Sequence, residues 1–334
     1  DSMTKRTIRI GGASGFWGEA AMATPQLLAA GGLDYIVYDY LAEITMSIMA
    51  RAHARDQNRG FATDFIDAVL QPHLADMAAQ GVKLISNAGG INPQTCAAAA
   101  TQLIDDAGLD LTVAVVSGDD LMAHKGAFAD RRITEMFSDQ NFPDPKDIAS
   151  INAYLGAFPI AQALALGADI VITGRCVDSA VTLGACIDAF GWKLDEFDRL
   201  AGGSLAGHIL ECGPQATGGN FTDWHKAAGS LADIGYPIAE VSADGSFVCT
   251  KPENTGGLVT VATVAEQALY EIGDPQAYVL PDVVCDFSSI RIEQQGPNRV
   301  LVRGAAGYTA PAAYQVCAPY ADGFRGGQRE SEAA

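Results

Sequence analysis

The chain has 334 residues, a length typical of two domains, and 49% of them are hydrophobic, which supports a sizeable core and excludes a wholly disordered chain. Forty acidic residues against 21 Lys and Arg give a net charge of −19, which argues against nucleic acid or an anionic membrane as a partner, because phosphates would be repelled. No apolar run is long enough and free enough of charges to predict a membrane-spanning helix.

Seven cysteines are spread along the chain without a CxxC pair, and their odd number argues against a disulfide framework. The first residues contain no apolar leader segment, so a cytoplasmic location is expected. The polar segment 325–334 is expected to be a disordered tail outside the fold.

Residues 5–190 contain short apolar runs, rich in Val and Ile, that are separated by helical patterns. These runs predict five strands, at Thr7–Ile10, Tyr35–Tyr38, Val82–Ser86, Leu111–Ser117 and Asp169–Thr173. Apolar residues at a period of 3.6 predict helices over Asp64–Ala79 and Leu155–Leu166, and Asn92 followed by Pro93 predicts a helix start. Strands that alternate with helices indicate parallel βαβ units, so we predict an α/β fold with a doubly wound, mostly parallel sheet.

From about residue 191 the sequence changes to glycine-rich stretches and hairpin signals. Ala243-Asp244-Gly245-Ser246 separates one pair of strand-like runs, and Gly296-Pro297-Asn298 separates another. A smaller, mixed α+β and β-rich domain is therefore predicted for residues 191–324.

In an open parallel sheet, ligands bind outside the carboxyl ends of the strands, so the loops that follow the predicted strands are candidate binding loops. The loop Gly11–Gly18 predicts either a tight turn or a phosphate or carboxylate site contacted by Gly12, Ser14 and Gly15. Its spacing differs from G-x-G-x-x-G and it lacks the Lys-Ser/Thr ending of a P-loop, which disfavours a nicotinamide cofactor.

Two further loops carry polar side chains at strand ends. After the third predicted strand, Gly89 and Gly90 open the backbone and Asn87 can direct its amide toward a ligand, although a capped turn explains them equally well. After the fourth, Asp119 and Asp120 can raise one another's pKa and act as acid or base, bind a divalent ion, or stabilise a helix start.

Two cations are candidate anion ligands in this acidic chain. Arg175 follows the fifth predicted strand and is either an anion clamp or a surface partner of Asp178 at i, i+3. Lys251, beside small-residue loops, either closes over an anionic substrate or belongs to an ordinary turn.

His208 and Glu211 lie three residues apart and share a helix face if this segment is helical. Such a pair is a metal half-site, an acid/base pair or a structural pair. A complete metal site needs a third ligand that the sequence does not identify, so no metal is predicted here. No G-x-S-x-G elbow occurs, which argues against an α/β-hydrolase.

Several strings in the chain belong to a common pattern: Gly11–Phe16, Asp39–Glu43 with Thr45-Met46, Asn87–Pro93, Gly118–Asp120, Gly167–Arg175, Gly207–Gly213, Lys251-Pro252 and Tyr270–Pro275. Taken together, they resemble the acyclic terpene utilisation protein A (AtuA) family. The resemblance extends from about Ile8 to Gly323. It implies a role near branched acyl-CoA chemistry, because some members are encoded beside acyl-CoA carboxylase and hydratase genes for citronellol and geraniol breakdown. It also implies a small C-terminal or separately encoded partner domain, which has no counterpart after Gly323.

We therefore expect an enzyme that acts on an acyl-CoA or related carboxylate thioester by hydration, dehydration or carbon–carbon lyase chemistry. Arg175 would hold an anion, and Asp119, Asp120 or Glu211 with His208 would move the proton. The alternative is a non-catalytic ligand-binding or scaffold subunit that needs the small partner domain, and a third hypothesis is a metal-dependent hydrolase. No cofactor is expected beyond coenzyme A as part of the substrate, and a homo-oligomer is a further expectation.

Overall fold

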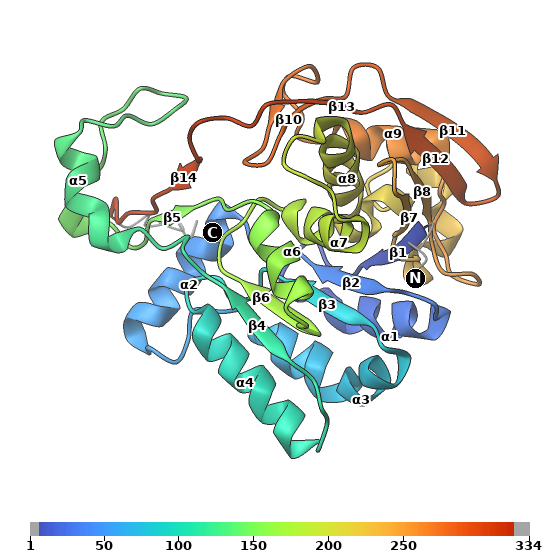
Figure 1. Cartoon of the computed structure of the whole chain (residues 1–334), viewed down its shortest axis with the longest axis horizontal. Coiled ribbons are helices and arrows are strands. Elements are labelled where there is room, and N and C mark those ends of the chain that lie inside the picture. Colours follow the sequence, from blue (N-terminus) through green and yellow to red (C-terminus); the bar gives the residue numbers. More distant parts are fainter. Residues whose placement is uncertain (1–6, 324–334) are drawn as a thin grey trace, which may run out of the picture.

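The computed structural model describes residues 7–323 and is built around one nine-stranded mixed sheet (Figure 1). The predictions for the first residues and for the tail 325–334 fall outside the described residues. In spatial order, the strands are β11 (Arg291–Gly296), β12 (Arg299–Arg303), β8 (Phe247–Thr250), β7 (Ile238–Ser242), β1 (Thr7–Gly12), β2 (Tyr35–Tyr38), β3 (Lys83–Ser86), β6 (Ile170–Thr173) and β4 (Val113–Val116).

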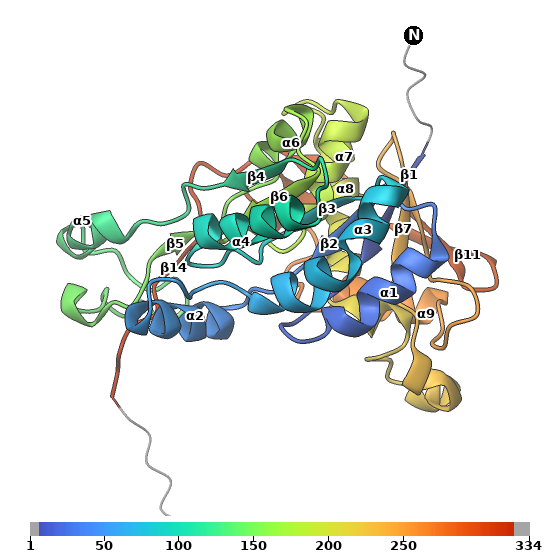
Figure 2. The same cartoon turned by 90° about the horizontal axis from the view of Figure 1, so that it is seen from below.

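Strands β1, β2, β3, β6 and β4 are parallel, and they are the five strands that the apolar runs predict. Helices cover both faces of this half (Figures 1 and 2). One face packs against α1 (Ala20–Ala30), α3 (Gln71–Gln80) and α4 (Pro93–Asp106), and the other against α6 (Phe158–Ala165), α7 (Ala180–Phe190) and α8 (Phe197–Leu210). Since both faces are covered, the strands are apolar at successive positions. The predicted doubly wound α/β arrangement is confirmed.

The predicted helices are present, with differences at their ends. The pattern over Asp64–Ala79 corresponds to a π-helical turn, η1 (Phe65–Leu70), that continues into α3. Asn92 caps α4, because its side chain accepts a hydrogen bond from the backbone N–H of Thr95. Helix α2 (Glu43–Arg55) has no counterpart among the predictions. In the described part of the chain, no helix is both long and apolar enough to cross a membrane.

Strands β7, β8, β12 and β11 form the antiparallel half of the same sheet. Both predicted hairpins are confirmed, with Asp244-Gly245 between β7 and β8 and Pro297-Asn298 between β11 and β12. β7 pairs with β1, so the strands of the second half extend the sheet of the first half. The division into two domains near residue 190 stays a prediction. Helix α9 (Val261–Leu269) packs beside α8.

Smaller elements complete the described chain. A three-stranded sheet contains β13 (Ala306–Tyr308), β10 (Val284–Asp286) and β9 (Tyr278–Val279), and a two-stranded ribbon contains β14 (Val316–Cys317) and β5 (Asn152–Ala153). Short 3₁₀ turns are η2 (Met122–His124), η3 (Pro145–Asp147), η4 (Gly213–Thr217), η5 (Trp224–Lys226) and η6 (Ala228–Asp233). The segment from η2 to η3, which holds α5 (Lys125–Asp130), projects from the body in both views, and we call it the α5 arm (Figures 1 and 2).

Candidate functional site

Buried polar side chains gather where the parallel strands end. The loops after β1, β2, β3 and β6 each carry at least one, and the end of α8 adds two more. We call this group the polar cluster: Ser14, Asp39, Asn87, Arg175, Asp178, His208 and Glu211. All but the half-buried Asp178 are nearly inaccessible to solvent. This edge of a parallel sheet is where α/β proteins bind their ligands.

The ends of β1, β2 and β3 are linked through Asp39. The Ser14 hydroxyl donates a hydrogen bond to the Asp39 carbonyl at 3.2 Å, and the Asn87 amide donates to Oδ1 of Asp39 at 2.6 Å. The Asn87 carbonyl oxygen accepts the Tyr40 backbone N–H at 2.7 Å. Asn87 therefore acts as a bridge between two strand ends, and it holds the Asp39 carboxyl in place.

Asp39 is in an environment that favours its protonated form. Burial raises its pKa well above the ordinary value, and the nearby negative charges of Asp178 and Glu211 raise it further. The Asn87 hydrogen bond and the charge of Arg175 act in the opposite direction but do not compensate. A protonated carboxyl is a hydrogen-bond donor, which a carboxylate is not.

Arg175 begins the loop after β6 and is 3% exposed. Its Nη1 donates to the Asp178 carboxylate and to the Cys176 carbonyl, both at 2.9 Å. The Tyr154 ring lies 4.2 Å from the guanidinium carbon, a distance suited to a cation–π contact. Burial lowers the pKa of Arg175, but the charge and hydrogen bond of Asp178 together with the nearby Tyr154 and Asp39 outweigh burial and raise this pKa above its ordinary value, so the side chain stays charged.

The remaining nitrogens of Arg175 are less engaged. Nη2 faces Glu43 at 3.8 Å, and Glu43 also accepts the hydroxyl of Tyr154. Nε is buried and has no hydrogen-bond partner among the described residues. The ion pair between Arg175 and Asp178, which was the alternative to an anion clamp, is therefore present. It uses only one of the three guanidinium nitrogens.

The two candidate carboxylates after β4, Asp119 and Asp120, lie in different environments. Asp119 is 3% exposed and accepts the Arg175 backbone N–H at 2.8 Å and the Asn152 amide at 2.9 Å. Burial raises its pKa, and the neighbouring Asp120 contributes least to that shift. Asp120 is exposed and accepts the backbone N–H of Met122. Asp119 thus anchors the Arg175 loop, while Asp120 caps a surface turn.

His208 and Glu211 form a buried pair at the end of α8. Nδ1 of His208 is hydrogen-bonded to Oε1 of Glu211 at 2.8 Å, and the two side chains are 1% and 5% exposed. The Gln267 amide donates to the His208 carbonyl at 3.0 Å, and the Tyr278 ring packs edge-on against the imidazole. The predicted i, i+3 pair is therefore present on one helical turn.

The pKa values of this pair suit proton transfer near neutral pH. Burial raises the pKa of Glu211 to about 7, against the opposing charge of His208. Burial lowers the pKa of His208, but the Glu211 carboxylate more than compensates, so that the imidazole pKa lies above its ordinary value. Nε2 of His208 and Oε2 of Glu211 are both buried without a partner among the described residues.

Glycines allow the β1 loop to contact the end of α8 directly. A Cβ on Gly12 would lie 2.8 Å from the Leu210 carbonyl oxygen, and a Cβ on Gly15 would lie 2.7 Å from the Cα of Cys212. Real side chains do not fit at such distances. These glycines thus have a packing role inside the protein, since they bring the end of α8 to the strand ends.

The other loop glycines have comparable roles. A Cβ on Gly207 would lie 2.7 Å from the Ser179 carbonyl oxygen, which fixes α8 against the segment that follows Arg175. A Cβ on Gly89 would collide with the Thr173 carbonyl oxygen. Gly90 has a φ of +52°, a conformation that L side chains rarely adopt. Their predicted ligand contacts stay predictions.

The β1 loop binds a carboxyl group supplied by the chain itself. The Gly15 backbone N–H donates to Oε2 of Glu19 at 2.8 Å, and the Tyr236 hydroxyl donates to Oε1 of the same carboxyl at 3.1 Å. Burial raises the pKa of Glu19. A phosphate at Gly15 would have to displace this carboxyl.

Lys251 is buried apart from the polar cluster. Its Nζ donates to the Thr255 carbonyl at 2.7 Å and to the Thr255 hydroxyl at 3.2 Å. Burial lowers its pKa. The structure assigns it no contact with Arg175, His208 or Glu211, so its role toward a substrate stays a prediction.

Sequence reasoning did not select Asp39, Tyr154 or Tyr278 as site residues, and it treated Asp178 only as a surface partner. Asp39 stands at the end of a predicted strand, and that position is the signal that could have identified it. Tyr278 lies in the two-residue strand β9, and Tyr154 directly follows the two-residue strand β5; neither position carries such a signal.

The arrangement supports proton transfer more than metal binding. Within residues 7–323, no three His, Cys, Asp or Glu side chains are grouped to hold a metal ion. A buried acid/base pair, a protonated carboxyl and a free guanidinium N–H can instead exchange a proton with a bound molecule and stabilise the negative charge that develops on it.

Comparison with known proteins gives one match. The model of a family described as "Acyclic terpene utilisation family protein AtuA" matches residues 8–329. No curated protein and no solved structure matches the chain.

Proposed function

This protein belongs to the acyclic terpene utilisation AtuA family, and from that premise we propose that it is an enzyme acting on an acyl-CoA or related carboxylate thioester. The reaction class is proton transfer at the carbon next to the thioester carbonyl, as in hydration, dehydration or carbon–carbon lyase chemistry. A cytoplasmic location is part of the proposal.

The observation that carries the proposal is the His208–Glu211 pair. It is buried, it is hydrogen-bonded internally through one atom of each partner, and the other atom of each partner is unpaired. A pKa of about 7 for Glu211 lets the pair accept and donate a proton under the same conditions. Structural pairs are normally satisfied on both sides, because an unpaired buried polar atom costs about 1–3 kcal/mol.

Removal of a proton beside a thioester carbonyl places negative charge on the carbonyl oxygen. Two groups in the cluster are suited to stabilise that charge: the Asp39 carboxyl in its protonated form, and the Nε–H of Arg175. A neutral carboxylic acid can donate a hydrogen bond to such an oxygen, and a guanidinium adds positive charge. Asp119 supports this role through the backbone of Arg175.

The proposal is tested by hydrogen exchange. The protein is incubated in deuterated water with a panel of straight and branched saturated, unsaturated and 3-hydroxy acyl-CoAs, and the mass of each thioester is followed. We expect deuterium uptake beside the carbonyl for at least one compound. His208→Gln and Glu211→Gln should slow uptake by about 10²–10⁴-fold, the usual contribution of a general acid or base. His225→Gln, at an exposed position, is the control and should exchange normally.

Two outcomes contradict the proposal. If no acyl-CoA binds by native mass spectrometry, the substrate class is wrong. If one binds without exchange, and exchange appears only with an added small partner domain, the scaffold alternative is favoured.

A further inference from the structure

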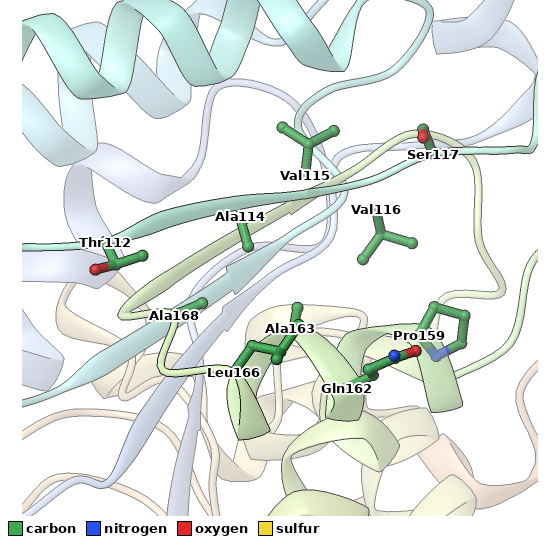
Figure 3. A pocket seen from close by; sticks show the side chains of 10 residues that line it. All are labelled: Thr112, Ala114, Val115, Val116, Ser117, Pro159, Gln162, Ala163, Leu166 and Ala168. Atoms are coloured by element: carbon green, nitrogen blue, oxygen red, sulfur yellow. The ribbon is translucent and has the colours of Figure 1, made fainter.

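Two grooves on the described surface differ in what they border. The first follows β4 on the side of α6 and is lined by residues of and around these two elements, none of which is charged (Figure 3). No side chain of the polar cluster lines it. The second has a volume of about 310 Å³ and lies between α2 and the segment that begins in β14, and we call it the α2 groove. The α2 groove, unlike the first, borders a side chain that contacts the polar cluster.

One wall of the α2 groove reaches Arg175 through Glu43. Glu43 and Ser47, both on α2, line this side. The Glu43 carboxylate faces Nη2 of Arg175 at 3.8 Å and accepts a hydrogen bond from the Tyr154 hydroxyl. The side chain of Arg175 is 3% exposed, whereas that of Glu43 is 65% exposed. The buried guanidinium is therefore connected to the groove by a carboxylate that is itself largely in solvent.

The opposite wall is formed by the segment from Cys317 to Asp322. It starts in β14, which pairs with β5 just before Tyr154, and in both views this ribbon lies beside α2 (Figures 1 and 2). Further along, the Ala321 backbone N–H donates to the Asp147 carbonyl at the end of the α5 arm. Within residues 7–323, no hydrogen bond or ion pair joins this segment to α2. The two walls can therefore separate without breaking a polar contact between them.

The charges of the α2 groove decide which part of a ligand fits. Glu43 and Asp322 place a carboxylate on each wall, and carboxylates repel the phosphates of a coenzyme. The pantetheine arm of an acyl-CoA is uncharged, and its amide N–H groups are donors for which carboxylate oxygens are acceptors. The groove is thus suited to the pantetheine arm, with the phosphates outside.

We propose that an acyl-CoA reaches the polar cluster through the α2 groove and that Glu43 is the gate of this path. The identity of the ligand rests on the proposed function. In the closed state, Glu43 is bound to Arg175 and to the Tyr154 hydroxyl. When Glu43 turns into solvent, Nη2 of Arg175 and the Tyr154 hydroxyl become donors for oxygen atoms of the entering ligand.

Cys317 reports whether a ligand occupies the groove. It is half-buried, as is Cys212, while the other five cysteines are buried. The whole chain is treated with N-ethylmaleimide, with and without an acyl-CoA from the exchange panel, and the labelled peptides are identified by mass spectrometry. At about ten times the dissociation constant of the ligand, alkylation of Cys317 should slow on the order of tenfold, because only the unliganded protein reacts. Cys317→Ser confirms the assignment of the labelled peptide.

The result separates this proposal from the proposed function. An acyl-CoA that binds by native mass spectrometry, while Cys317 is alkylated at an unchanged rate, overturns the groove as the path and leaves the proposed function standing. Slower alkylation of Cys212 alone, which does not line the groove, has the same meaning. If no acyl-CoA binds, both the proposed function and the path fail.

Glu43→Ala tests the gate. The apparent dissociation constant of the acyl-CoA should fall on the order of tenfold, because the closed state no longer competes with the ligand. Glu43→Gln, whose amide oxygen still accepts the Tyr154 hydroxyl but carries no charge, should give an intermediate value. Asp76→Ala removes an exposed carboxylate from α3 and is the control, which should bind as the wild type does. Unchanged or weaker binding by Glu43→Ala, in a protein that circular dichroism shows to be folded, overturns the gate.

Discussion

Arg175 and Lys251 occupy comparable places in the sheet, but their polar surroundings differ. Each is a nearly inaccessible cation that follows a strand, β6 or β8, and the carboxyl ends of both strands lie at the same edge of the sheet. Around Lys251, one residue, Thr255, accepts both of its hydrogen bonds. Around Arg175 there are several carboxyl groups, an aromatic ring and a buried N–H without a partner.

The comparison shows that burial and charge do not by themselves identify a site. Both cations satisfy these two conditions. What distinguishes the Arg175 region is that its polar groups are only partly paired, and the same holds for His208 and Glu211 nearby. Partly paired groups cost stability, and a bound molecule that pairs them recovers it.

Of the two buried cations, replacement of Arg175 should have the larger effect on stability. Arg175→Met should lower the free energy of unfolding by about 3 kcal/mol, because it leaves the Asp178 carboxylate and the Leu41 and Cys176 carbonyls without their donor. Urea unfolding measures this loss. A loss below about 1 kcal/mol would mean that Arg175 is only a surface partner of Asp178.

The His208–Glu211 pair should give a pH effect on the order of 3 kcal/mol, because the pKa of Glu211 differs by roughly 2.5 units between the folded protein (about 7) and the unfolded chain (4.5). Folded Glu211 holds a proton up to a pKa of about 7, whereas the unfolded chain releases it near 4.5, so stability falls as the pH rises between these values. The raised pKa of His208 acts in the same direction. Protonated His208 stabilises the folded protein below pH 6.5, the pKa of histidine in the unfolded chain, and this stabilisation is lost as the pH rises through the higher pKa of the folded protein.

Glu211→Gln should change the sign of this slope. Without its partner, buried His208 has a depressed pKa, and stability then rises as the pH rises through 6.5. Urea unfolding of both proteins from pH 5 to pH 8 gives the comparison. Identical slopes would show that the pair is not the titrating group.

Gly15→Ala should destabilise the protein by about 2 kcal/mol, because the added methyl group collides with the backbone at Cys212. Valine at this position would disturb the fold before it affected a ligand. Gly229→Ala, with open space around the new methyl group, is the matched control and should change stability by less than about 1 kcal/mol. Equal thermal midpoints for the two variants would contradict the packing role of Gly15.

Replacement of Lys251 should have the smallest effect on stability. Lys251→Met keeps the aliphatic stem and removes a charge whose burial is unfavourable, so the change in unfolding free energy should be within about 1 kcal/mol. Deuterium exchange should continue as in the wild type. A large loss of acyl-CoA affinity in this variant would place Lys251 at the substrate after all.

Local patterns were sufficient for much of the fold. The Val- and Ile-rich runs identify the parallel strands, and Asp244-Gly245 identifies a hairpin, because these structures depend on neighbours in sequence. The pairing of β7 with β1 depends on residues far apart in the chain, so no local signal could show that the second half extends the same sheet.

The sequence predicted at which edge of the sheet the candidate site lies, but not which of its polar groups have hydrogen-bond partners. The strand-end rule located Asn87, Asp119 and Arg175 at one edge of the sheet. It could not separate Asp119, which is satisfied, from Arg175, which is not, because hydrogen-bond partners come from distant segments. It also could not show that Gly15 packs against the end of α8, because that contact joins segments far apart in the sequence.

The central position of β1 has a consequence for how the chain folds. Ile8, near the beginning of the chain, is opposite Val241 in the finished sheet. During synthesis β7 is made long after β1, so one of the two edges of β1 stays unpaired until the segment up to Ser242 has been produced. Pairings of such large sequence separation close slowly, and an exposed apolar strand invites wrong partners in the meantime. We therefore expect refolding yield to fall with protein concentration more steeply than it would for a sheet assembled from neighbouring strands.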